Sequence, residues 1–114
     1  MALTALSKVA PEWYTPESEK EEEQPARFRL QPLTPPQLEE VFEPDATGNI
    51  AIPLRNYGRV LRYGLTDWEQ VSDANGKPLK CTPFNHTRIP TSLRIDLAGE
   101  ILARSQVSEE DKKN

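Results

Sequence analysis

The chain has one cysteine, Cys81, and one histidine, His86, five positions further on. A cysteine beside a histidine can act as a nucleophile pair in covalent catalysis, provided that a third residue orients the imidazole ring. No residue for that third role is evident, and a lone cysteine is more often a small buried apolar residue. The pair therefore predicts packing rather than catalysis, and we assign the chain no catalytic residue.

The sequence also lacks the residues that metal binding and paired-acid catalysis usually require. A zinc site needs several cysteine and histidine ligands, which one of each cannot supply. Asp67, Asp73, Glu39 and Glu40 are candidate carboxylates, but paired-acid catalysis holds two of them about 5 to 10 Å apart across a cleft, and nothing in their spacing indicates one. Residues 73–76 lack the remaining oxygen ligands of a calcium loop and predict a surface turn. We expect no metal and no cofactor.

The net negative charge of the chain comes from its first 26 residues. Of the 14 basic and 18 acidic side chains, two lysines and six glutamates lie in residues 1–26, which leaves 12 of each sign in residues 27–114. A neutral body has no broad positive field with which to bind a phosphate backbone. Nucleic acid is therefore an unlikely partner.

Three arginines, Arg55, Arg59 and Arg62, line one face of a helix expected over residues 53–63. One interpretation is a helix that follows phosphates and stacks bases on Tyr57 and Tyr63, and the neutral body argues against it. A second is a solvated face whose arginines pair with local acids. A third is a docking face for an acidic partner helix or for the protein's own glutamate-rich leader.

Composition divides the chain into an acidic, proline-containing leader over residues 1–26, one small globular domain over 27–107 and a charged tail over 108–114. The leader has no apolar periodicity, so we expect it to be flexible and disordered. Its first apolar residues are too few for a signal peptide, and no apolar run approaches the roughly 20 residues of a membrane span. We expect no membrane segment and a cytoplasmic location.

The first expected elements of the domain are a strand and a helix. Residues 27–31 alternate polar and apolar side chains, which is typical of a strand with one buried face. Thr34 is placed as an N-cap, with Gln37 positioned to close a capping box, so a helix is expected over 35–43. Proline at the first helical position supports this start.

Two glycines mark the second expected helix, over residues 53–63. Gly64 is suited to the left-handed conformation that ends many helices. Gly58 lies inside the helix, where glycine costs about 1 kcal/mol relative to alanine, so it suggests close approach by another element.

The remaining elements complete a small α+β, mainly helical fold. Asn75-Gly76 predicts a tight turn, and residues 71–82 are expected to pair with the strand at 27–31. The clearest helix covers 91–105, where apolar residues recur every four positions. The fold thus has about three helices and a short hairpin or strand pair.

Apolar residues supply further candidates for partner binding. So small a core is expected to leave apolar surface, and the face of helix 91–105 is expected to divide between packing and docking. Trp68 is expected to pack, with its indole N–H bonded to a carbonyl, and an exposed hot spot is the alternative. The candidate partner-binding residues are Leu93, Leu97, Ile101, Trp68, Arg55, Arg59 and Arg62.

Two blocks of the chain resemble a known group of proteins. Residues 60–68 end in Tyr63-Gly64-Leu65-Thr66-Asp67-Trp68 and lead through a turn at 73–78 to Phe84, and residues 89–114 contain an apolar stripe and a charged end. The spacing of these blocks is similar to that of small proteins encoded among the virion structural and tail-assembly genes of tailed bacteriophages and prophages, some of them tail assembly chaperone-like. The opening residues 1–5 fit the same group.

The resemblance implies a phage morphogenesis accessory protein that acts in tail assembly by docking onto other proteins, without enzymatic activity. Its partners would be other phage structural or tail proteins, or a second copy in a homo-oligomer, in the host cytoplasm or in the virion. Two alternatives stay open: a phage-encoded inhibitor of a host enzyme or defence complex, with the acidic leader as a nucleic-acid mimic, and a minor virion structural component.

Overall fold

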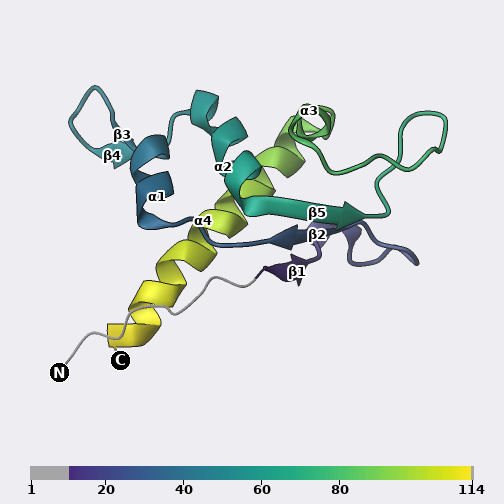
Figure 1. The fold of residues 1–114 in the computed structure, drawn as a ribbon, viewed down its shortest axis with the longest axis horizontal. Helices are drawn as coiled ribbons and strands as arrows, with labels where there is room; N and C mark the ends of the chain where they lie inside the picture. Colours follow the sequence, from purple (N-terminus) through teal and green to yellow (C-terminus); the bar gives the residue numbers. More distant parts are fainter. Residues whose placement is uncertain (1–10, 114) are drawn as a thin grey trace.

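The computed structural model describes the backbone of residues 11–113 and the side chains of residues 11–105. It confirms a small α+β fold (Figure 1). The helices are α1 (Pro35–Val41), α2 (Tyr57–Gly64), α3 (Pro83–His86) and α4 (Thr91–Lys113), with 3-10 turns η1 (Glu17–Glu19) and η2 (Leu54–Asn56). An antiparallel sheet has the order β1 (Glu12–Tyr14), β2 (Arg27–Leu30), β5 (Leu65–Glu69), and β3 (Glu43–Pro44) pairs with β4 (Ile50–Ala51).

The core lies between the sheet and helices α2 and α4. Phe28 and Leu30 of β2 are fully buried, whereas Arg29 between them is exposed, so the alternation expected for this strand is confirmed. Phe28 meets Trp68 of β5 edge to face, with ring centroids 6.2 Å apart. Leu97 and Ile101 of α4 are also fully buried in this cluster.

The first helix begins as expected. The Thr34 hydroxyl accepts a hydrogen bond from the Gln37 backbone N–H, and the Gln37 side chain accepts one from the Thr34 N–H, which completes the capping box. The helix ends at Val41 rather than at residue 43, because Pro44 favours an extended conformation in the residue before it.

The strand that pairs with β2 is β5, not residues 71–82. Leu65 and Trp68 are both buried although they are three positions apart, because a bulge opposite Arg29 and Leu30 leaves Thr66 as an extra residue. That irregular spacing hides the strand from a search for strict alternation. The segment after β5 forms only the isolated bridge between Ser72 and Pro78 around the expected turn, where Gly76 has φ 81°.

Gly64, not Gly58, is the glycine at which another element approaches closely, and neither glycine forms a left-handed helix cap. Gly64 is the last residue of α2, and the chain continues directly into an extended Leu65, so no left-handed cap follows. A Cβ at position 64 would lie 2.6 Å from Cγ2 of Ile101, so the close approach of α2 and α4 takes place there. A Cβ at position 58 would meet only Arg94 Nη2, at 3.7 Å, an ordinary contact.

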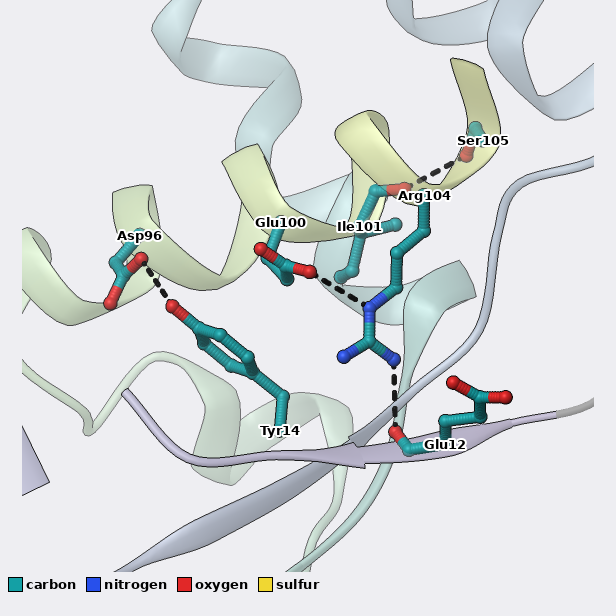
Figure 2. A network of polar contacts seen from close by, with 7 residues as sticks. All are labelled: Glu12, Tyr14, Asp96, Glu100, Ile101, Arg104 and Ser105. Atoms are coloured by element: carbon teal, nitrogen blue, oxygen red, sulfur yellow. Dashed lines mark hydrogen bonds and ion pairs between the residues drawn. The ribbon is translucent and has the colours of Figure 1, made fainter. Parts of the chain in front are cut away.

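Residues 11–26, expected in a disordered leader, belong to the fold. Strand β1 pairs with β2, and Figure 2 shows it also held by α4. The Tyr14 hydroxyl donates to Asp96 Oδ1 at 3.1 Å, and Arg104 Nη1 donates to the Glu12 carbonyl at 3.1 Å. Composition could not show this, because the contacts are made by polar side chains of α4 that lie more than 80 positions away in the chain. Residues 1–10 lie outside the described residues.

The last helix is longer than expected. Its apolar pattern predicts an end near residue 105, followed by a separate charged tail, whereas α4 runs without interruption to Lys113. Charged residues such as glutamate and lysine are good helix formers, so they continue the backbone helix where the apolar stripe has ended.

Candidate docking surface

Cys81 and His86 do lie together, with Sγ and Nε2 3.5 Å apart. Burial, with a smaller contribution from the charge of Asp67, raises the pKa of the Cys81 thiol to about 12. Burial, aided by Arg94 and Arg62, lowers the pKa of His86. The thiol therefore stays protonated at neutral pH and is a poor nucleophile. The imidazole packs on the Trp68 ring, with centroids 5.9 Å apart.

The apolar residues expected to dock a partner are mostly taken up by the core. Leu97 and Ile101 are fully buried and Leu93 is half-buried. Trp68 is 6% exposed and donates from Nε1 to the Leu79 carbonyl at 2.7 Å, so the expected packing role is confirmed and little of the ring is left at the surface. The apolar stripe of α4, which was expected to be partly free for docking, is covered because α4 packs directly against α2.

The three arginines of η2 and α2 are all exposed, but they differ in their partners. Arg55 forms an ion pair with Glu43 of β3. Among the side chains of residues 11–105, no carboxylate lies within ion-pair distance of Arg59 or Arg62. The expected pairing with local acids therefore holds for Arg55 alone.

Sequence reasoning missed an exposed apolar site beside Arg55. Ile50 and Leu54 are each 66% exposed, more than other aliphatic side chains of comparable size that the structure describes. They are chain neighbours of Ala51 and Pro53, which line an open pocket of about 280 Å³. The other lining residues are Glu43, Pro44, Asp45, Ile52 and Arg55. We call Ile50, Leu54 and this pocket the hairpin surface.

The turn of the hairpin is organised by Asp45. Its Oδ1 accepts hydrogen bonds from the Thr47 N–H at 2.8 Å and the Asn49 N–H at 3.0 Å, and also from the Thr47 hydroxyl. These bonds lower the pKa of Asp45, the Thr47 hydroxyl contributing most. Gly48 takes φ 87°, a left-handed conformation that glycine adopts without strain. The turn thus presents Ile50 in a defined position.

Asn56 joins the hairpin to the rest of the molecule. It is buried, and its Nδ2 donates to the Val41 carbonyl and to Glu43 Oε2, both at 2.9 Å. The other Glu43 oxygen pairs with Arg55, so the carboxylate that lines the pocket is held from two sides. Asparagine just before a helix is typical of an N-cap, but Asn56 makes no capping bond and its side chain is used here instead.

The hairpin surface offers two exposed aliphatic side chains and a pocket lined by Pro44, Pro53 and the Glu43–Arg55 ion pair. This combination suits an apolar side chain of a protein partner. In the part of the chain with described side chains, no three His, Cys, Asp or Glu residues are grouped so as to hold a metal ion. Within the described residues, no helix has the length and apolar character that a membrane crossing requires.

Comparison of the chain with protein-family models, with curated proteins and with solved structures finds no match in any of the three. The function is therefore inferred from the surface just described and from the resemblance of the two sequence blocks.

Proposed function

We propose that the chain is a non-enzymatic binding protein of phage morphogenesis, acting as a chaperone-like accessory in tail assembly in the host cytoplasm. The resemblance of residues 60–84 and 89–114 to the tail-assembly group supports the biological setting. The hairpin surface supports the mode of action, because it can dock another protein.

The observation that carries the proposal is the exposure of Ile50 on the hairpin and of Leu54 in η2, two elements that Asn56 and Glu43 join by a hydrogen bond. Fully burying one such side chain is worth about 1.5–3 kcal/mol, so covering the exposed part of both contributes about 2–4 kcal/mol to binding. Because Asn56 and Glu43 hold the hairpin in place, little ordering entropy opposes docking there. The hairpin surface is thus preorganised for binding a partner.

The mechanism follows from the chemistry of the site. An apolar side chain of a tail subunit enters the pocket, and Ile50 and Leu54 cover the apolar surface around it. A subunit held in this way is shielded from premature association until assembly displaces it. Such a role needs moderate affinity, which a small surface provides.

The test is a pull-down of the tagged chain from infected cells. The double variant Ile50→Ser, Leu54→Ser removes the apolar contacts, and Ile95→Ser on α4 is the matched control, because Ile95 is 43% exposed on a different element. We expect wild type and the control to recover tail proteins and the double variant to recover at least tenfold less. Equal recovery by all three chains would exclude the hairpin surface as the docking site.

The alternatives give different outcomes in the same material. An inhibitor of a host enzyme or defence complex recovers that host protein without tail proteins. A minor virion component is detected by mass spectrometry in purified virions, whereas a transient chaperone is absent from them.

A further inference from the structure

A second surface, on α2, carries positive charge that no ion pair with a described side chain neutralises. Arg59 and Arg62 are one helical turn apart and exposed, and neither forms an ion pair with any of the described side chains. Both act on the neighbouring Tyr63, where their charges oppose the rise in its pKa caused mainly by the hydrogen bond to Glu40.

Arg94 of α4 adds a third guanidinium to this surface. Its Nη2 lies 3.7 Å from the position that a Cβ of residue 58 would occupy, so it reaches across to α2. Its Nε is buried and has no hydrogen-bond partner among the described residues. The charges of Arg94 and Arg62 both contribute to lowering the pKa of His86. We call Arg59, Arg62 and Arg94 the arginine face.

The complementary charge lies in the loop between β1 and β2. Glu21, Glu22 and Glu23 are exposed there, and no basic side chain with described coordinates pairs with them. Both ends of this loop are fixed, by the pairing of β1 with β2 and by the contacts of β1 with α4 (Figure 2). Figure 1 shows the loop and α2 on opposite sides of β2 and β5. The loop is therefore kept away from the arginine face of its own chain.

We propose that the arginine face binds the acidic loop, residues 17–24, of a second copy of the chain. The two surfaces are different, so the contact is head-to-tail and leaves one free surface of each kind at the ends of the assembly. A phosphate backbone fits less well, because the chain has a net charge of −4 and the Tyr63 hydroxyl is bound to Glu40. The association is weak and depends on salt, and it stands independently of the tail-assembly role.

The experiment is sedimentation equilibrium of the full chain over a range of concentrations. At about 10 mM ionic strength, where charges act over about 30 Å, we expect the mean mass of wild type to rise with concentration, and at about 1 M we expect a monomer. Two charge reversals, Arg59→Glu with Arg62→Glu and Glu22→Lys with Glu23→Lys, should each give a monomer at low salt. Mixing the two variants should restore association, since each then meets opposite charges on the other.

The matched control is Lys77→Glu with Lys80→Glu, which changes the net charge as much as the arginine reversal but lies on the exposed loop after β5. It should associate like wild type. A wild-type chain that stays monomeric at low salt, reversed variants that associate unchanged, or a mixture that remains monomeric would each overturn the proposal. So would a monomeric chain that binds an oligoglutamate peptide, because the occupant would then be a foreign acidic protein.

Discussion

Gly64 of α2 lies directly against Ile101 of α4, where a Cβ would come within 2.6 Å of Cγ2. Ile101 is fully buried, so it cannot move aside without disturbing the core. The contact sets how closely the two main helices of the fold approach.

Gly64→Ala is therefore expected to lower the free energy of unfolding by about 1–3 kcal/mol, as overpacking does in other cores. Gly58→Ala is the matched control, because it is in the same helix and its Cβ would meet only an ordinary contact. It is expected to raise stability by about 0.5–1 kcal/mol through better helix propensity. Urea unfolding of both variants measures this, and effects of the same sign would contradict the packing described.

Asn56→Ala removes the hydrogen bonds from η2 to the Val41 carbonyl of α1 and to Glu43 of β3, and leaves the Val41 carbonyl without this partner. We expect a loss of about 1–3 kcal/mol in unfolding free energy. Asn85→Ala is the control, since its side chain also bonds a carbonyl, that of Lys80, but at an exposed site. It should cost less. If the two variants are equally stable, Asn56 does not have the positioning role assigned to it.

Tyr14→Phe tests the attachment of β1 to α4. Burial first, and then the hydrogen bond to Asp96, raise the pKa of Tyr14 to about 12. The unfolded chain therefore releases this proton at lower pH, and the stability contributed by Tyr14 is present below about pH 10 and lost as pH rises toward 12. Ultraviolet absorbance of the folded protein should show a late-titrating tyrosine that Tyr14→Phe removes. An unchanged titration curve in the variant would show that Tyr14 is not held as described.

The lowered pKa of His86 predicts how the stability of the fold changes at mildly acidic pH. Its pKa in the folded state is lowered by burial and by Arg94 and Arg62, so the unfolded chain binds the proton first as pH falls. Stability should be highest above about pH 6.5 and decline below it toward the folded-state pKa. His86→Gln should flatten this decline between about pH 6.5 and 5, where few carboxylates titrate. Thermal unfolding at stepped pH measures the slope, and an equal slope in both chains would rule out His86 as its source.

Local features of the fold were predictable from the sequence. The capping box at Thr34 and the apolar stripe of α4 depend on residues close together in the chain, and they were confirmed. Strand β5 was missed because its bulge breaks the two-residue period. Strand β1 was missed because a segment poor in apolar residues is held here by polar contacts across more than 80 positions.

The candidate docking residues show a second limit of prediction from the sequence. An apolar stripe predicts that a residue will be buried, but not whether the chain itself or a partner buries it. Leu97, Ile101 and Trp68 are buried by the chain itself. Ile50 lies in a two-residue strand and Leu54 at the start of the helix expected over 53–63, and only the three-dimensional packing shows that both are left exposed.

The contacts between β1 and α4 also have a consequence for synthesis on the ribosome. Tyr14 is translated 82 positions before Asp96, and Glu12 92 positions before Arg104. The first strand of the sheet can pair with β2 early, but its contacts with α4 form only after that helix has left the ribosomal tunnel. A nascent chain stalled before α4 has emerged should be cut by protease within residues 11–26, and release of α4 should make the same segment resistant.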